Sequence, residues 1–178
     1  GKEGIQERMY IILKIVLGIG IVICSMRIGI LISKKYVFRL EELDELKNDF
    51  KIIENKIKYT YQPLEEIFTE VAEISSYGIA SLFKNTAENI KEKGAENAWK
   101  DEVKKCDLNL KKEDKEALKE FGILLGKTNK EGQINQIKFV SELLERQIEK
   151  AEIEKAKNET MYKKLGMIFG IGLVIVLI

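Results

Sequence analysis

The chain has 178 residues, with 30 Lys and Arg against 29 Asp and Glu, no His, one Pro and two Cys. This length suits one domain with short appendages. The net charge of +1 argues against a nucleic-acid binder, which normally carries a clear basic excess. The absence of His removes the commonest general base and metal ligand, and two Cys cannot complete a tetrahedral thiolate zinc site. We therefore expect no catalytic residue, no metal and no cofactor.

Apolar residues are concentrated in two runs, 9–33 and 165–178, whereas residues 1–8 are expected to be an N-terminal extension or remnant. The first run contains only Lys14 and Arg27 as charged residues, and it exceeds the roughly 20 residues that a membrane span requires. A charge such as that of Arg27 costs about 2.5–3.5 kcal/mol at the centre of a bilayer, and less near the headgroups. A buried core helix is the alternative, but the run has no polar face. We predict a first transmembrane helix over 9–33.

The second run, 165–178, has no charged residue, but it is short enough that a core helix is an alternative. Tyr162, Lys163 and Lys164 precede it and form an aromatic and basic collar of the kind found at membrane interfaces. We therefore predict a second transmembrane helix over 165–178, with a thinned bilayer accommodating its short length.

Basic residues flank both predicted spans on the side of the middle segment, 34–164. Lys34 and Lys35 follow the first span, and Lys163 and Lys164 precede the second, so all four are expected at the membrane interface. Because short cytoplasmic flanks carry an excess of Lys and Arg, this pattern predicts that the middle segment is cytoplasmic.

The middle segment shows helical periodicity almost throughout, with breaks at Pro63, at a turn over 75–81, at Gly94 and at a polar loop over 126–132. The predicted helices cover 43–57, 64–74, 84–93, 95–106, 110–125 and a last helix from Gln133 toward Lys164. Apolar stripes on these helices predict a core that includes Leu43, Leu46, Phe50, Ile53, Ile57, Leu64, Ile67, Phe68, Val71, Ala72, Ile74, Ala117, Leu118, Phe121, Ile137, Val140, Leu144, Ile148 and Ala151. The fold class is therefore all-α, a cytoplasmic bundle of about six helices flanked by an N-terminal and a C-terminal transmembrane helix.

Three features have two interpretations each. The stripe over 43–57 suits a short coiled coil, but its length of about two heptads favours packing within the bundle. Trp99 suits either the core or an exposed anchor for a partner. The loop 126–133 is either a contact site or a plain connection between helices.

Gly126-Lys127-Thr128 is only superficially similar to a phosphate-binding loop. Such a loop needs four residues between its first glycine and the Gly-Lys-Thr and a strand before it, whereas only three residues separate Gly122 from Gly126 and the segment is helical. A glycine that ends a helix, followed by a polar turn, explains these residues.

The residues resemble a known family in their order and spacing from Met9 to the end of the chain. The matching positions are Arg39, Leu43 and Leu46; Ile53 to Tyr59 followed by Gln62-Pro63-Leu64-Glu65; Ala98-Trp99; Leu118 to Gly126, then Asn129 and Gly132-Gln133; and Lys157-Asn158-Glu159 before Leu165-Gly166 and Gly170. In this pattern the chain resembles the stage III sporulation protein AB family of endospore-forming bacteria. It departs from the family at Gln62, Phe68, Asn129 and Arg27, none of which corresponds to a catalytic residue.

The resemblance implies a multi-pass protein of the mother-cell membrane that surrounds the forespore, with a cytoplasmic helical domain. It would be a non-enzymatic platform subunit of a secretion-like channel between the two cells, similar to the inner-membrane platform proteins of type II secretion and type IV pilus machines. The implied partners are other membrane proteins of the channel, a cytoplasmic secretion-type ATPase, membrane lipid and a second copy of the chain, but no nucleic acid. The candidate partner-binding residues are Arg39, Tyr59, Pro63, Trp99, Lys127, Asn129, Gly132 and Gln133.

Two other functions compete with the platform role. A two-span membrane sensor or signalling adaptor would need a sizeable outer domain, and both predicted outer segments are short. A degenerate nucleotide hydrolase would need nucleotide affinity.

Overall fold

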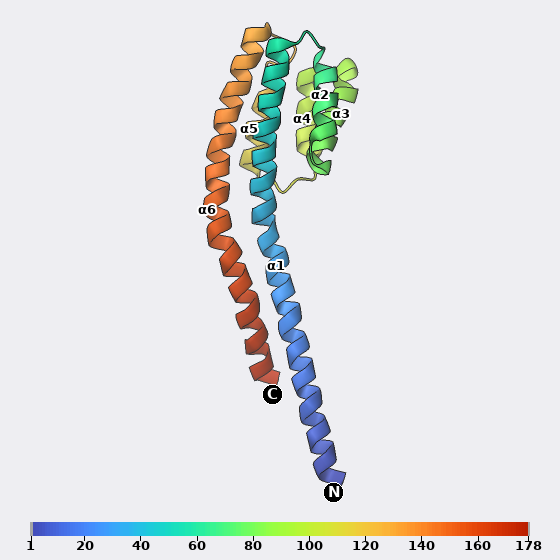
Figure 1. Ribbon diagram of the computed structural model, residues 1–178, viewed down its shortest axis with the longest axis vertical. Helices are drawn as coiled ribbons and strands as arrows, with labels where there is room; N and C mark the ends of the chain where they lie inside the picture. The colour runs from blue at the N-terminus through green and yellow to red at the C-terminus, as the bar shows by residue number, and fades with distance from the viewer. Residues whose placement is uncertain (1, 178) are drawn as a thin grey trace. The chain divides into compact units, whose positions relative to one another are not determined.

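The computed structural model describes residues 2–177, and the side chains of all of these except 2–5, 7, 159, 176 and 177. Within this range there are six helices and no strand, which confirms the all-α prediction (Figure 1). The helices are α1 (Lys2–Tyr59), α2 (Leu64–Ile74), α3 (Tyr77–Lys93), α4 (Ala95–Lys105), α5 (Lys112–Gly122) and α6 (Lys130–Leu177). The chain forms two compact units: unit 1 contains Gly1–Val37 and Ile153–Ile178, and unit 2 contains Phe38–Glu152.

Several helix boundaries differ from those predicted. The run 9–33 and the helix 43–57 are parts of one helix, α1, because no Pro or Gly separates them. Helix α3 begins at Tyr77, and Gly78 lies in its first turn rather than in a loop. A Cβ on Gly78 would lie 2.7 Å from Cδ2 of Leu108, so this glycine permits close packing against the segment after α4.

Helix α6 begins at Lys130, three residues before the predicted start at Gln133. The side chain of Asn129 caps it, because Oδ1 accepts a hydrogen bond of 2.9 Å from the backbone N–H of Gly132. The predicted core was wrong at Ile74, which is 64% exposed. Helix α2 ends at that residue, and the chain turns at Ser75 and Ser76 toward α3.

The core of unit 2 is built around five aromatic rings, one from each of the helices α1 to α5. The rings belong to Phe50, Phe68, Phe83, Trp99 and Phe121, and all five side chains are fully buried. Phe50 stacks on Phe121 with ring centroids 4.4 Å apart, and Trp99 meets Phe121 edge to face at 4.9 Å. These are the offset and perpendicular geometries that aromatic quadrupoles favour. Each of the five helices thus contributes one large side chain to the same cluster.

Two of the open interpretations are thereby decided. Trp99 is a core residue, and its indole N–H donates a hydrogen bond of 2.6 Å to the backbone carbonyl of Leu118. The stripe over 43–57 packs into the same core rather than into a separate coiled coil, and its apolar residues are buried. Gly122 is needed beside the indole, because a Cβ there would lie 2.9 Å from Cδ1 of Trp99.

A buried ion pair joins α1 to α5. Nε of Arg39 lies 2.7 Å from Oδ2 of Asp114, and Nη2 lies 2.8 Å from Oδ1, so the guanidinium engages both carboxylate oxygens. Oδ2 also accepts the backbone N–H of Lys111 at 2.7 Å, which caps the first turn of α5. A charge held out of water is stable only while its partner and hydrogen bonds remain in place.

Replacing one member of this pair should therefore be far more damaging than replacing both. We expect Asp114→Ala to lower the free energy of unfolding by about 3–5 kcal/mol, because it leaves the guanidinium buried and unpaired. The double variant Arg39→Met/Asp114→Leu should recover most of this loss, apart from about 1 kcal/mol for the lost cap. Chemical denaturation of the full chain in detergent, followed by circular dichroism, measures both. Equal losses in the two variants would contradict the pairing argument.

Two carboxylates of α1 hold the turn between α2 and α3. Asp49 is buried and accepts a hydrogen bond of 2.9 Å from the hydroxyl of Ser75, while Glu45 accepts the backbone N–H of Ser76. Burial, with a smaller contribution from the nearby charge of Glu45, raises the pKa of Asp49 to about 6, although the hydrogen bond from Ser75 opposes both effects. The ionised carboxylate is therefore less stable in the fold than in the unfolded chain.

A raised pKa in the fold means that Asp49 opposes stability as the pH rises from about 4 to about 6 and opposes it fully above that range. We expect Asp49→Asn, whose amide oxygen can still accept the bond from Ser75, to be more stable than the parent at pH 7.5 by about 1–2 kcal/mol. The advantage should shrink when both proteins are unfolded at pH 4.5. A difference that is independent of pH would show that Asp49 does not titrate in this way.

Candidate functional site

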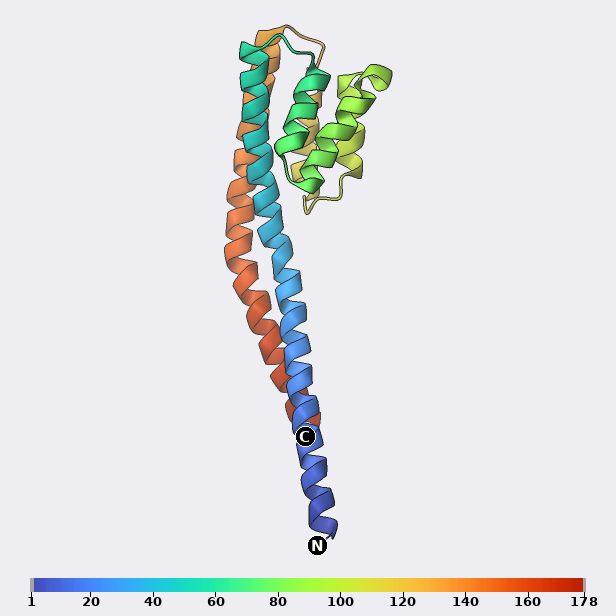
Figure 2. The ribbon, with the colours of Figure 1, turned by 45° about the vertical axis from the view of Figure 1, so that its right-hand side comes forward.

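Unit 1 is a pair of antiparallel helix segments, one from α1 and one from α6, that approach at glycines (Figures 1 and 2). A Cβ on Gly29 would lie 2.5 Å from the carbonyl oxygen of Tyr162, and a Cβ on Gly166 would lie 2.7 Å from that of Ser25. A Cβ on Gly170 would lie 2.9 Å from Cα of Val22. Such backbone contact at residues spaced four apart is how helices associate inside membranes, where water does not drive them together.

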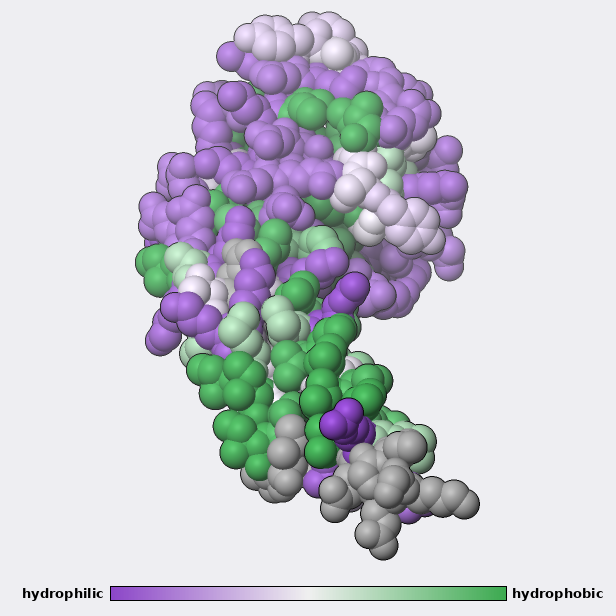
Figure 3. All heavy atoms as spheres, turned by 60° about the horizontal axis from the view of Figure 1, so that its bottom comes forward, coloured by the Kyte–Doolittle hydropathy of each residue, from purple (hydrophilic) through white to green (hydrophobic). Residues whose placement is uncertain are grey.

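Most of the remaining surface of this helix pair is apolar and exposed. The exposed large side chains of α1 between residues 9 and 32 are Met9, Tyr10, Ile11, Ile12, Leu13, Ile15, Val16, Leu17, Ile19, Ile23, Ile28, Leu31 and Ile32. On α6 they are Leu165, Met167, Ile168, Phe169, Ile171, Leu173 and Ile175. Figure 3 shows hydrophobic residues gathered over these segments, whereas the surface of unit 2 is mainly hydrophilic. An apolar surface of this extent is typical of protein that contacts lipid or another protein.

One helix among the described residues is long and apolar enough to cross a membrane, and it lies within Arg8–Tyr59 of α1. Only 11% of its most apolar stretch is buried, whereas a core helix of the same composition would be mostly buried. The apolar run of α6 is not among the segments that meet this criterion within the described residues, and it extends beyond them. The second predicted span therefore stays a prediction.

The glycine contacts also align the two apolar runs. Gly29 lies beside Tyr162 and Gly166, and Gly18 lies beside Val174, whose Cγ1 would be 3.2 Å from an added Cβ. The rings of Tyr36 and Tyr162 stack with centroids 6.0 Å apart. The predicted collar of α6 is therefore level with the end of the apolar run of α1, and both runs extend from there in the same direction.

This packing is testable with two glycines of the same helix. Gly29→Leu should separate the helices, because its side chain would overlap backbone of α6, whereas Gly20→Leu should be tolerated, because nothing lies within 4 Å of a Cβ at Gly20. We expect a drop in melting temperature of several degrees for the first variant only, corresponding to about 2 kcal/mol. Thermal unfolding of the full chain in a mild detergent measures the difference. Similar melting temperatures for both variants would mean that the helices do not approach at Gly29.

A second candidate region lies in unit 2, where the segment between α1 and α2 meets the segment between α5 and α6. We define the loop-end surface by its residues Tyr59, Tyr61, Gln62, Pro63, Gly126, Lys127, Asn129, Lys130 and Gln133. A cavity of about 330 Å³ lies between its two segments and is lined by Tyr61, Gln62, Gly126, Lys130 and Gln133. Nζ of Lys130 lies 5.3 Å from the centre of the Tyr61 ring, within the range of a cation–π contact.

The loop-end surface unites candidate residues that are far apart in the sequence. Tyr59, Pro63, Lys127 and Asn129 are exposed, and Gly132 and Gln133 are half-buried beside them. Sequence reasoning did not single out Tyr61, although its side chain is fully exposed. The Tyr-x-Tyr spacing directly before Pro63 was the available signal.

Several residues of this surface also build the local structure. Asn129 caps α6 through Gly132, and the side-chain amide of Gln133 donates a hydrogen bond of 3.2 Å to the carbonyl of Thr128. Lys127 pairs with Glu96 of α4, whose pKa is lowered to about 2 by hydrogen bonds from Lys100 and Lys127. The loop 126–133 is therefore a structured connection, and only its exposed groups are available to contact a partner.

Arg39 and Trp99 do not belong to the loop-end surface. Arg39 is buried in the ion pair with Asp114, and Trp99 is buried in the aromatic cluster, so neither side chain is accessible in this fold. Their matches to the family pattern are explained by the stability of unit 2.

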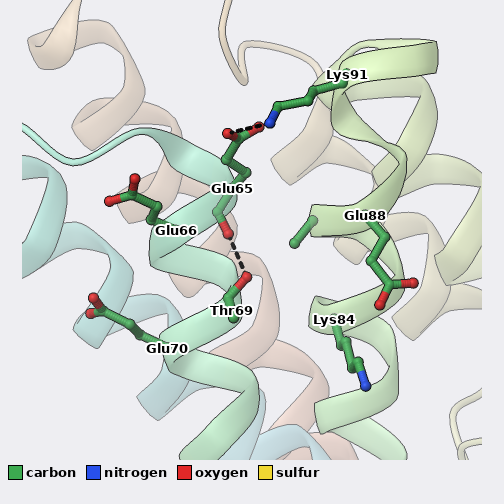
Figure 4. Close-up of a pocket in the computed structure, with 8 residues that line it drawn as sticks. Glu65, Glu66, Thr69, Glu70, Lys84, Glu88 and Lys91 are labelled. Atoms are coloured by element: carbon green, nitrogen blue, oxygen red, sulfur yellow. Dashed lines mark hydrogen bonds and ion pairs between the residues drawn. The ribbon is translucent and has the colours of Figure 1, made fainter.

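A cleft of about 600 Å³ lies between α2 and α3 (Figure 4). Glu65, Glu66 and Glu70 line it from α2, and Lys84 and Glu88 line it from α3. Glu65 pairs with Lys91 at 3.2 Å across its rim. Hydrogen bonds from Lys56 and Gln62 lower the pKa of Glu70 and keep it ionised. The cleft presents a charged, solvent-exposed surface, and among the described residues no group of three or more His, Cys, Asp or Glu could hold a metal ion.

Comparison with known proteins gives concordant results. A family model described as stage III sporulation protein AB matches residues 14–178. A relative named stage III sporulation protein AB from Bacillus subtilis (strain 168) is 31% identical over 170 residues, which cover 93% of this chain and 99% of the relative. A solved structure of a stage III sporulation protein AB superposes with a TM-score of 0.63 at 27% identity, covering 67% of this chain and 98% of that chain.

Proposed function

Because the chain belongs to the stage III sporulation protein AB family, we propose that it is a non-enzymatic platform subunit of the secretion-like channel between mother cell and forespore. In this role the helix pair of unit 1 anchors the protein in the mother-cell membrane. Unit 2 lies in the cytoplasm and docks a secretion-type ATPase and other channel components.

The observation that carries the proposal is the close glycine packing of two helix segments whose outer faces are apolar and exposed. A soluble domain would bury these side chains, since each Å² of apolar surface left in water forgoes about 25 cal/mol of stabilising free energy. A bilayer covers them without any further protein. Both segments then cross the membrane as one hairpin, with the glycine contacts supplying the association that lipid does not.

The distribution of charge between the two units supports the proposed orientation, with unit 2 in the cytoplasm. Unit 1 carries 10 Lys and Arg against 4 Asp and Glu, and unit 2 carries 20 against 25. Lys34, Lys35 and Lys164 are exposed beside the apolar runs, where the positive-inside rule places cytoplasmic flanks. The acidic unit 2 is repelled by an anionic membrane surface, and its charge suits partners with basic docking surfaces.

The loop-end surface is the proposed contact with the ATPase. Tyr59, the last residue of α1, and Tyr61, two residues later, are both exposed. Nζ of Lys58 lies 5.1 Å from the centre of the Tyr59 ring, and Nζ of Lys130 lies 5.3 Å from that of Tyr61. Exposed tyrosines beside structured backbone are frequent anchors of protein interfaces, because they bury a large area at small entropic cost. The adjoining cavity of about 330 Å³ offers room for a partner side chain.

Co-purification from sporulating cells tests this function with two exposed tyrosines of unit 2. Tyr61 is 100% exposed on the loop-end surface, and Tyr77 is 91% exposed at the start of α3. Tyr61→Ala should reduce recovery of the ATPase about tenfold, the effect of losing a hot-spot residue worth somewhat over 1 kcal/mol, whereas Tyr77→Ala should have no effect.

The outcome separates the docking surface from the platform role. If the parent chain and Tyr61→Ala recover the ATPase equally well, the contact lies elsewhere on unit 2. A parent chain that recovers neither the ATPase nor channel ring proteins, together with normal spore formation after deletion of its gene, would refute the platform role itself.

A further inference from the structure

Arg27 lies close in sequence to the glycine contacts of the helix pair, but on the opposite face of α1. It is two residues from both Ser25 and Gly29, which approach α6, so at about 100° per residue its side chain points away from α6. The side chain is exposed, and no described residue forms an ion pair or hydrogen bond with it. Its neighbours on the same face, Ile23 and Leu31, are exposed apolar residues.

Lys34 lies on this same face, seven residues and about 10 Å further along α1. Its side chain is exposed as well. Side chains on a helix lean toward the N-terminus, so Lys34 leans toward Arg27, whereas Arg27 leans away from the collar and deeper into the apolar run. The long side chain of Arg27 must therefore turn back toward Lys34 to place its guanidinium near the headgroups, where an anionic partner stabilises the charge.

The surroundings of this face are basic. Segments 27–37 and 153–164, which form the part of unit 1 around the collar, contain seven Lys and Arg but only two Glu. The collar thereby provides a local excess of positive charge at the level where phosphate groups of lipids lie.

We propose that Arg27 and Lys34 bind the phosphate of an anionic phospholipid on the outer face of α1. The planar guanidinium would engage two phosphate oxygens, and the lysine would add a point charge from above. The acyl chains would lie along Ile23, on the side of Arg27 that faces the interior of the apolar run. This apolar face is the reason to assign a lipid rather than a free phosphate ion. The inference rests on the proposed membrane anchoring of unit 1.

Native mass spectrometry of the full chain tests this site. The protein is purified in detergent, mixed with phosphatidylglycerol or phosphatidylcholine, and the lipid molecules that it retains are counted. We expect retention of phosphatidylglycerol over phosphatidylcholine, and a loss of about fivefold or more in Arg27→Leu, given roughly 1 kcal/mol for each cationic residue near a lipid headgroup. Arg27→Gln should lose as much and serves as the second variant if Arg27→Leu does not fold.

Lys14→Leu is the matched control, because it removes one charge from the same helix near its other end. It should retain phosphatidylglycerol like the parent chain. Equal retention of the two lipids by the parent, or unchanged retention in both Arg27 variants, overturns the site. Displacement of phosphatidylglycerol by inorganic phosphate would show an anion site without a lipid requirement and would overturn the assignment too.

Recovery of the parent chain in the membrane fraction is measured in the same preparations. Its absence there would refute the membrane anchoring of unit 1, whereas membrane recovery without a preference for anionic lipid refutes only the lipid site. Arg27→Leu should be recovered in membranes at least as well as the parent, since it removes the charge from the apolar run.

Discussion

The pairing of Arg39 with Asp114 constrains unit 2 more than any other single contact. Two charges without water must remain joined, so the start of α5 is held against α1 wherever these residues are. Because Asp114 also caps α5 through Lys111, the same carboxylate determines where that helix begins. Four and seven residues after Asp114, Leu118 and Phe121 then reach the Trp99 indole and the ring of Phe50. Burial of the aromatic cluster thus depends on an electrostatic contact at the edge of the core.

The division of the chain into two units follows from a change along α1. In its first half apolar side chains occur all round the helix, and in its second half they form one stripe between charged residues. The same change occurs in α6 in the reverse order. A helix with apolar residues on every side requires a different environment from one with a single apolar stripe. The residue pattern alone therefore specifies a different environment for each of the two units.

The fold class and most of the core could be predicted from the sequence, because three-to-four spacing survives in every helix of unit 2. The boundaries of the helices were harder to predict. Gly78 has the signature of a turn but is a packing residue against Leu108, a contact that no local pattern reveals. Asn129 moves the start of α6 by capping it, which is a short-range signal that could have been recognised from Asn followed by Gly132.

The candidate sites show the same distinction between local and distant determinants. The apolar runs and their basic flanks are local features, and the sequence identified them. The grouping of Tyr61 with Lys130 depends on two segments that are 69 positions apart, and only the fold brings them together. Arg39 was selected for its place in a family pattern, but its partner Asp114 is 75 positions away, so its buried role could not be read from neighbouring residues.

The single tryptophan of the chain has a practical consequence. Trp99 lies in the dry aromatic cluster of unit 2, with its indole N–H bonded to a carbonyl, and unit 1 contains no tryptophan. All indole fluorescence of the intact protein therefore originates from one environment in unit 2, at the meeting point of five helices. The wavelength of its emission maximum reports whether the indole is shielded from water in that core. No label is needed, and the helices in the detergent micelle do not contribute to the signal. The integrity of the bundle can thus be followed optically in the same sample in which assembly is studied.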